Sequence, residues 1–457
     1  MSDAASGEPP YPKRGYAWYV CLILLLAYIL SFLDRTIVSL LVIPMEHDLH
    51  ISDTEIGLLQ GFSFALFYAV LGLPIARLVD ARSRRGIIAA GIFMWSVMTA
   101  ACGAAGRFSE LFAARVGVGA GEATLLPGAV SMLADYFPPK RRGLALGVFS
   151  TGIFLGSGLA LIVGGLLIRA IGNHTYVVPL LGPLDAWRVV FLAVGLPGLI
   201  VAALMAAVAE PPRLGRKAAA GYGFDLAEVI AYFRRNAATI LCHNMGFTLV
   251  ALVGFAAGAW IPAMFIRRFG WTAAEIGIRF GLITLVVGPL GSVVGGWLCD
   301  RMEHKGRRDG KLRVGLIAAL GAFPFALAFP LVPKAGVALA LIGPFYFFVS
   351  FVWGLAPAAL QEIMPNQMRG QATAVYTGIL NLVGLGLGPT SVALITDFVF
   401  RNPQAVNFSI AAIVPAAALL AALLFRIGYA PYLRTLDRLP HWMPRERAAV
   451  APALADI

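Results

Sequence analysis

Hydrophobic residues occur along this chain in long runs, separated by short segments that hold most of the charged residues. A helix of about 20 apolar residues is long enough to cross the hydrocarbon core of a bilayer. The runs predict twelve such helices, at 17–43, 55–78, 86–105, 108–134, 143–169, 188–209, 238–266, 275–300, 312–333, 337–362, 371–398 and 407–428. Continuous runs exclude a β-barrel, whose strands alternate apolar and polar residues. We therefore expect an all-α membrane protein with twelve transmembrane helices.

Two short repeats divide the chain into halves. An acid followed by basic residues occurs after the second run, at 77–86, and again after the eighth, at 296–308. A proline followed by a basic segment and a glycine opens the fifth run, at 138–143, and the eleventh, at 365–370. Repeats in matching positions predict two pseudo-symmetric six-helix bundles, related by an axis along the membrane normal.

The runs and repeats give five segments. We expect a cytoplasmic tail at 1–16, a bundle at 17–209, a linker at 210–237, a second bundle at 238–428 and a cytoplasmic tail at 429–457. Apolar residues recur in the linker at helical spacing, which predicts an amphipathic helix on the inner membrane surface. They are Leu226, Val229, Ile230 and Phe233.

Composition and charge support a membrane protein. The 457 residues are 59% hydrophobic and only 13% charged, whereas a soluble domain carries about 25% charged residues. Lys and Arg gather in the loops on the side of the two termini, so the positive-inside rule places both termini in the cytoplasm. This bias accounts for the net charge of +12 without nucleic acid. We expect a multi-pass protein of the cell inner (plasma) membrane, whose partner is the lipid bilayer.

The candidate chemistry does not indicate an enzyme. The four cysteines are isolated from one another, with no Cys-x-x-Cys or Cys/His cluster to indicate a metal site. No nucleotide-binding loop or nucleophile–base motif stands out. We expect no cofactor apart from protons as a coupling ion, no nucleic-acid partner, and a monomer.

Three charged residues, Asp34, Arg115 and Glu122, lie inside the predicted helices 17–43 and 108–134. A charge at bilayer depth costs at least about 2.5–3.5 kcal/mol, so it is usually kept for work on ions or substrates. Counted from the ends of their runs at about 1.5 Å per residue, Asp34 and Arg115 reach a similar depth. Glu122 lies on the same helical face as Arg115 and about 10 Å deeper. The pattern predicts one base flanked by two acids at two levels.

This arrangement can act as a proton switch. Arg115 stays charged at any accessible pH, whereas a proton can neutralise either carboxylate. We predict that Asp34, Glu122 and Arg115 couple protons to transport, and that protonation of the acids releases Arg115 and Arg35 to an anionic head group. The alternative is a fixed salt bridge between Asp34 and Arg115, with Glu122 only hydrogen-bonded.

The loop at 77–86 resembles the signature of the major facilitator superfamily, Gly-x-Leu-x-Asp-Arg-x-Gly-Arg-Arg. The chain keeps Leu78, Asp80, Arg84 and Arg85 but has Ala76, Ala81 and Ser83 at the other signature positions. The resemblance implies that the acid caps the eleventh helix and that a base pairs with Asp135 at the end of the fourth. Both interactions would hold the inner side shut. The expected gating residues are Asp80, Arg84, Arg85, Asp135, Arg142, Asp300 and Arg301.

Within that superfamily the chain resembles the Spinster family of lysolipid and sphingolipid-phosphate exporters. The resemblance rests on Phe32-Leu33-Asp34-Arg35, on 115–123 with its Glu122, and on Gly156-Ser157-Gly158-Leu159. It implies that the acids of the first and fourth helices bind protons, with Arg115 between them. Ser157 occupies the place where antiporters of the superfamily often have proline, so antiport is less secure than proton coupling.

The second half has no charged residue at mid-span, and its candidate lining residues are neutral or aromatic. A charged wall that faces a neutral, aromatic wall suits an amphipathic anion. The predicted substrate-binding residues are Arg35, Arg115, Glu122, Thr124, Tyr68, Asn244, Thr248, Trp353, Tyr376 and Asn381. We expect a proton-coupled transporter of a lysolipid or sphingolipid-like anion; the alternative is a proton-coupled symporter of small organic anions such as carboxylates or sugar acids.

Overall fold

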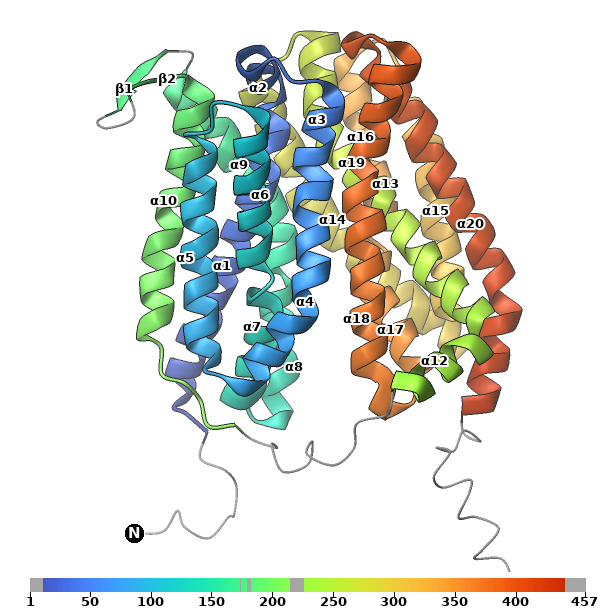
Figure 1. Ribbon diagram of the computed structural model, residues 1–457. Helices are drawn as coiled ribbons and strands as arrows, with labels where there is room; N and C mark the ends of the chain where they lie inside the picture. The colour runs from blue at the N-terminus through green and yellow to red at the C-terminus, as the bar shows by residue number, and fades with distance from the viewer. Residues whose placement is uncertain (1–10, 173, 179–181, 214–225, 440–457) are drawn as a thin grey trace, which may run out of the picture.

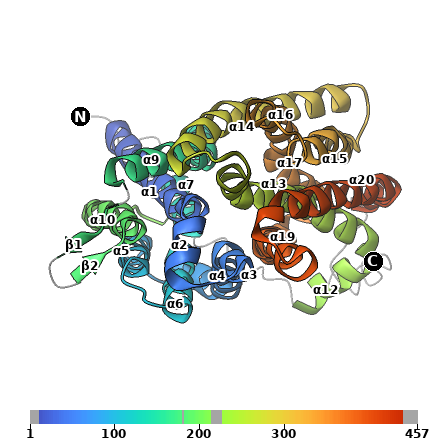
Figure 2. The same cartoon turned by 90° about the horizontal axis from the view of Figure 1, so that it is seen from above.

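The computed structural model describes residues 11–172, 174–178, 182–213 and 226–439, which form two helical bundles side by side (Figures 1 and 2). The elements of the first half are α1 (Arg14–Leu40), α2 (Val42–Leu49), α3 (Asp53–Gly57), the π-helical segment η1 (Leu58–Phe62), α4 (Ser63–Ala81), α5 (Arg84–Cys102), α6 (Phe108–Glu122), α7 (Leu125–Tyr136), α8 (Pro139–Ser150), α9 (Gly152–Ile171), the antiparallel strands β1 (Tyr176–Val178) and β2 (Gly182–Leu184), and α10 (Ala186–Ala207).

The linker contains α12 (Leu226–Arg235), and the second half follows it. Its elements are α13 (Ala237–Phe269), α14 (Ala273–His304), α15 (Gly310–Ala328), α16 (Ala335–Val349), α17 (Val352–Glu362), η2 (Asn366–Met368), α18 (Arg369–Ile379), the π-helical η3 (Leu380–Leu387), α19 (Gly388–Leu394), the π-helical η4 (Ile395–Phe400), η5 (Pro403–Ala405) and α20 (Val406–Arg438).

Each of the twelve predicted runs corresponds to one helical column, so the all-α prediction is confirmed. Among the described residues, eleven columns are long and apolar enough to cross a membrane; the other column is formed by α3, η1 and α4 over 53–81. The fold differs from the expectation in two places. The last helix continues to Arg438, so the first part of the expected tail at 429–457 is helical. A small β-hairpin also precedes α10, where the apolar runs gave no signal.

The two halves start their second helix in the same way. Ser52 and Glu55 form a capping box that begins α3, and Thr272 and Glu275 form the same capping box at the start of α14. Each pair satisfies backbone N–H groups that a helix start leaves unbonded. The first turn of each column lies against the other half: α3 against α19, and α14 against α9. This correspondence supports the pseudo-symmetry of the two bundles.

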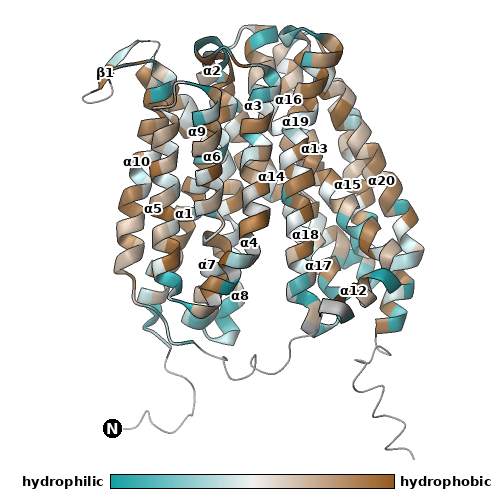
Figure 3. Ribbon diagram, viewed as in Figure 1, coloured by the Kyte–Doolittle hydropathy of each residue, from teal (hydrophilic) through white to brown (hydrophobic). Residues whose placement is uncertain are grey.

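We call the end of the bundle that carries α2 and α3 the upper end, and the end that carries α12 the lower end (Figure 1). Apolar residues cover the middle of the helices, and polar residues gather at both ends (Figure 3). Contacts between the halves run along α9 with α14 and along α4 with η3. The charged cluster of the first half, described next, lies on α1 and α6.

Candidate functional site

An ion pair joins the first and fourth helical columns. Arg35 of α1 donates from Nε to Glu122 Oε2 at 2.6 Å, and its Nη2 contacts the same oxygen. The Glu122 side chain is fully buried, whereas that of Arg35 is 24% exposed. The Arg35 guanidinium also lies 4.1 Å from the ring centre of Phe64. The buried carboxylate of Glu122 needs a charged partner such as Arg35, because desolvation of an unpaired charge costs several kcal/mol.

Arg115 is also fully buried but has a different environment. Its Nη1 donates to the main-chain oxygen of Asp34 at 2.9 Å, so α1 and α6 do bring Asp34 and Arg115 together. Among the described residues, Nε and Nη2 of Arg115 and Oε1 of Glu122 have no hydrogen-bond partner. Buried polar atoms are normally bonded. The unmet donors of Arg115 and the unmet oxygen of Glu122 therefore mark a site that can accept a further group.

The geometry changes the predicted arrangement of one base between two acids. Glu122 pairs with Arg35, one residue after Asp34, and not with Arg115. The cluster thus holds two bases and two acids. The Asp34 carboxyl interacts electrostatically with Glu122, Arg115 and Arg35. Helical spacing along α6 placed Arg115 and Glu122 correctly on one face. It could not determine which arginine of the two helices each acid meets.

The predicted lining residues lie in several environments. Asn244 and Tyr376 both contact His243. The Nδ1 atom of His243 lies 2.8 Å from Asn244 Oδ1, and its ring centre lies 5.5 Å from that of Tyr376. Thr248 is fully buried, and its hydroxyl has no hydrogen-bond partner among the described residues. The remaining predicted residues mostly contact their own or adjacent helices: Trp353 packs on Phe255, Asn381 Nδ2 donates to Thr377 O at 2.9 Å, and Thr124 Oγ1 donates to Gly121 O at 2.8 Å. The side chain of Tyr68 lies outside the described part.

A second charged cluster, which the pattern of the sequence does not indicate, joins the two halves at the upper end. Arg267 of α13 donates from Nη2 to Glu46 Oε1 at 2.7 Å and to Asp53 Oδ1 at 2.6 Å. Nearby, the Thr54 hydroxyl donates to Asp397 at 2.6 Å. In the described part of the chain, every inter-half hydrogen bond that involves a side chain lies at this end. The upper end is therefore closed.

Glu46 and Asp53 share Arg267 as their partner, and the pKa of Glu46 is raised at this site. Burial is the main cause that raises the pKa of Glu46 to about 8, and a hydrogen bond from the protonated Glu46 to Asp53 adds to it, whereas Arg267 acts in the opposite direction. In the sequence, Glu46 and Asp53 appear as ordinary loop acids near the end of an apolar run. Their role in joining the two halves is visible only in their contact with Arg267 of α13, more than 200 residues away in the sequence.

The gating residues at the lower end make contacts within each half. Arg84 pairs with Asp135, as expected, and it also donates from Nε to Glu210 Oε1 at 2.9 Å. Arg85 donates to Val208 O at 3.1 Å. The Arg142 Nε has no hydrogen-bond partner among the described residues. The side chain of Asp80 lies outside the described part.

The second half uses a different base at the equivalent place. Lys311, in the first turn of α15, contacts Glu303 and donates to Glu362 at the end of α17 at 2.5 Å. This pair corresponds to Arg84 and Asp135 in the first half. Asp300 and Arg301, the predicted gating residues here, are exposed and form no ion pair in the part of the chain that the structure describes. Their gating role stays a prediction.

Comparisons with known proteins agree with this architecture. The model of a family described as Major Facilitator Superfamily matches residues 24–389. The chain is 29% identical over 437 residues to an MFS-type efflux pump of Mycolicibacterium smegmatis, which covers 93% of this chain and 95% of the pump. It is 26% identical over 363 residues to a probable L-galactonate transporter of Escherichia coli, over 75% of this chain and 76% of that protein.

A solved structure is also similar over almost the whole length. It is a bacterial homologue of the human lysosomal transporter Spinster, in an inward-facing and unoccupied conformation. The two folds superpose with a TM-score of 0.75 at 26% identity, over 95% of this chain and all of the other. The Spinster resemblance of the sequence is therefore supported over the full fold and does not rest on three helices alone.

Proposed function

The chain belongs to the major facilitator superfamily, and we propose that it is a proton-coupled transporter that moves a lysolipid or sphingolipid-like anion by alternating access. It is a membrane transporter and not an enzyme. The observation that carries the proposal is the ion pair between Arg35 and the fully buried Glu122. It places a titratable acid and a partly exposed base in one contact, beside a buried arginine with unmet donors.

Protonation of Glu122 changes what Arg35 can bind. When Glu122 is ionised, its carboxylate accepts a hydrogen bond from the Arg35 guanidinium. When a proton neutralises Glu122, the charge-assisted bond weakens and Arg35 becomes available to an anionic ligand. Arg115 keeps its charge throughout. Proton binding and anion binding are thereby linked through one side chain.

The position of the inter-half bonds supports alternating access. The halves are joined at the upper end by Arg267, whereas the ion pairs at the lower end stay within each half. The similar Spinster homologue is in an inward-facing conformation. We assign the upper end to the outside and the lower end to the cytoplasm of an inner membrane, with both termini cytoplasmic and the present conformation inward-facing. Outward opening then requires the Arg267 cluster to separate.

The difference between the halves supports an amphipathic substrate. The first half contributes the charged residues Arg35, Arg115 and Glu122. The second half contributes Tyr376, Trp353 and neutral residues such as Asn244. A head group on the first half and an apolar chain on the second would satisfy both surfaces. The resemblance of the sequence to the Spinster family of lysolipid exporters implies the same substrate class.

A symporter of small organic anions is the second candidate. It is favoured by the similarity to the probable L-galactonate transporter and needs only the two arginines. The two candidates differ in whether the ligand has a long apolar chain.

Flux measurements distinguish them. The purified protein is reconstituted in vesicles with an imposed pH gradient, and transport of a fluorescent lysophospholipid is compared with that of radiolabelled L-galactonate. We expect gradient-dependent movement of the lysolipid only. Movement of the sugar acid alone would favour the second candidate, and transport of neither would contradict both.

A further inference from the structure

A recess with an unusual charge lies at the lower end of the second half. It has a volume of about 460 Å³ and is formed by the end of α14, the start of α15 and Tyr429 of α20. Four of its nine lining residues are basic and, among these lining residues, none is acidic: the bases are Arg301, Lys305, Arg307 and Arg313. Such a recess attracts an anion.

The recess continues a stripe of α14 that faces outward from the bundle. The exposed large apolar residues of this helix recur every three or four positions and are Leu282, Val286, Leu290, Val293 and Trp297. They cover about 22 Å at 1.5 Å per residue, most of the thickness of a hydrocarbon core. Arg301 and Lys305 follow one and two turns later on the same face. The stripe thus passes from apolar residues to tryptophan and then to bases, as at a membrane–water interface.

Depth along the helix places Arg301 among lipid head groups. The head-group layer adds about 5–8 Å to each side of the core. Arg301 lies about 6 Å beyond Trp297 along the helix axis, and its guanidinium lies 5.5 Å from the Trp297 ring centre. The other wall supplies Leu316 and Ile317, which can contact the first carbons of an acyl chain.

Most of this charge is not neutralised by the protein. In the described part of the chain, Arg301, Lys305 and Arg307 form no ion pair. Arg313 is held by Asp309, whose two oxygens accept from its Nε at 2.8 Å, and it lies 4.7 Å from the Tyr429 ring centre. One base is therefore fixed in place, and three remain to receive a ligand.

We propose that this recess binds the phosphate of an anionic phospholipid from the leaflet at the lower end, with Arg301, Lys305 and Arg307 around the phosphate and the apolar wall against the acyl chains. Basic pockets on the cytoplasmic side of membrane proteins recognise lipid head groups in this way. The bound lipid connects α14 to α15 and α20 within one half. This site does not depend on which substrate the protein transports.

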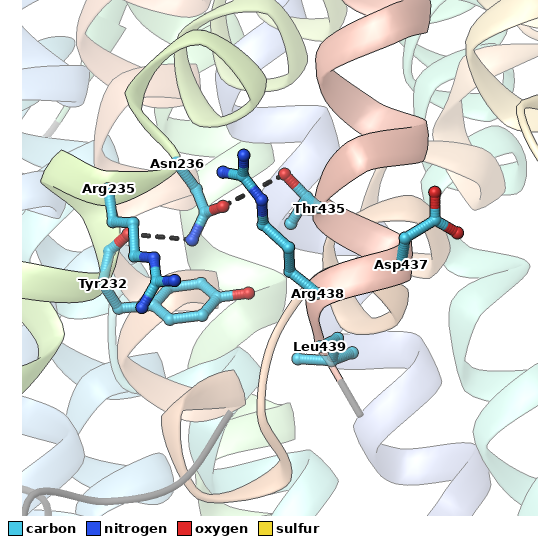
Figure 4. Close-up of a pocket in the computed structure, with 7 residues that line it drawn as sticks. All are labelled: Tyr232, Arg235, Asn236, Thr435, Asp437, Arg438 and Leu439. Carbon is cyan, nitrogen blue, oxygen red and sulfur yellow. Dashed lines mark hydrogen bonds between the residues drawn. The ribbon is translucent and has the colours of Figure 1, made fainter. Parts of the chain in front are cut away.

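A second basic recess at the lower end provides a comparison. It lies between α12 and the end of α20, with a volume of about 170 Å³, and contains Arg235 and Arg438 (Figure 4). Its Asp437 bonds Arg308 at 2.6 Å. Arg438 lies about 16 Å along α20 beyond Ile427, the last exposed large apolar residue of that helix in the described part. Arg438 therefore lies farther beyond the apolar band of its helix than Arg301 does, and unlike the first recess this one has an acid among its lining residues.

Thermal stability of the purified full chain in detergent tests the proposal. We expect phosphatidylglycerol to raise Tm, and phosphatidylcholine or inorganic phosphate at the same concentration to leave it unchanged. The variant R301Q/R307Q should lose more than half of the phosphatidylglycerol shift. The matched control R235Q/R438Q, which removes the same charge from the second recess, should keep it.

Any one of four results would overturn the proposal. An equal loss in the control variant would indicate general attraction between basic residues and anionic lipid. Equal stabilisation by inorganic phosphate would indicate a site for the free anion, and equal stabilisation by phosphatidylcholine would indicate no head-group recognition. If R301Q/R307Q does not fold, native mass spectrometry of K305Q replaces it, and bound phosphatidylglycerol at the wild-type level would contradict the proposal. None of these measurements depends on transport.

Discussion

At the scale of single residues, Glu46 makes closure of the upper end depend on pH. Its pKa is raised to about 8 in the closed conformation, chiefly by burial, and an open upper end would return it to water with an ordinary value near 4.5. The closed state therefore binds an additional proton between these values. The contribution of Glu46 to the free energy of closure is complete below about pH 4.5 and is lost as the pH rises through about 8.

We expect the distance between spin labels at the exposed positions His50 and Gln404, one in each half, to lengthen as the pH rises past about 8. Pulsed electron paramagnetic resonance measures it, and the four native cysteines are buried. The variant E46Q, which resembles the protonated acid, should stay closed at high pH. A wild-type distance distribution that does not change between pH 5 and pH 9 would contradict this assignment.

Arg84 is predicted to be the residue whose loss destabilises the first half most at its lower end. Its side chain is 1% exposed and bonds both Asp135 and Glu210, so R84Q leaves two acids without their shared partner. Removing one member of a buried ion pair typically costs about 3–5 kcal/mol. Thermal unfolding in detergent should show a clear loss for R84Q and almost none for the exposed R82Q. Equal stability of the two variants would show that the network is not structural.

The residues that the sequence revealed are those whose position along a helix is sufficient. Asp34, Arg115 and Glu122 are conspicuous because they interrupt apolar runs. The partner of Glu122 was not predictable, because Arg35 and Arg115 are both within reach and side-chain packing decides between them. Likewise Lys311, and not Arg301, pairs in the second half, since the pairing depends on how α15 meets α17.

At the scale of elements, close contact between α14 and α9 holds the upper parts of the halves together. A Cβ added at Gly277 would lie 2.8 Å from the main-chain oxygen of Leu161, whereas one at Gly296 of the same helix would meet nothing within 4 Å. We expect G277A to cost about 1–3 kcal/mol and to lengthen the label distance at the upper end. G296A should change neither. A G277A protein with wild-type Tm and distance would show that the helices separate without cost.

Hydrophobic runs gave the twelve helical columns because burial in lipid requires continuous apolar helices. The hydrophobic runs did not predict where the α-helix is interrupted within a column. The column at 371–398 contains the π-helical segments η3 and η4, and their extra residues leave the apolar pattern unchanged. The end of α20 at Arg438 was also missed, since polar residues continue this helix beyond the apolar run.

At the scale of the whole molecule, the pseudo-symmetry of the halves followed from repeated loop motifs, whereas the conformation did not. A sequence is compatible with every state of a transporter. The closed upper end became visible only through the contacts of Arg267 with Glu46 and Asp53. These contacts and the Arg35–Glu122 pair lie at different levels, so one proton-sensitive contact can control ligand binding and the other can control opening.

Proton coupling through Glu122 is tested by measuring lysolipid flux, driven by a pH gradient, in vesicles that contain E122Q or the control E110Q. Glu110 lies on the same helix but is exposed, and among the described residues it bonds its neighbours Arg107 and Gly106. We predict that E122Q loses most of the stimulation by a pH gradient, at least tenfold, while E110Q keeps it. Wild-type gradient dependence in E122Q would show that this buried acid does not couple protons to transport.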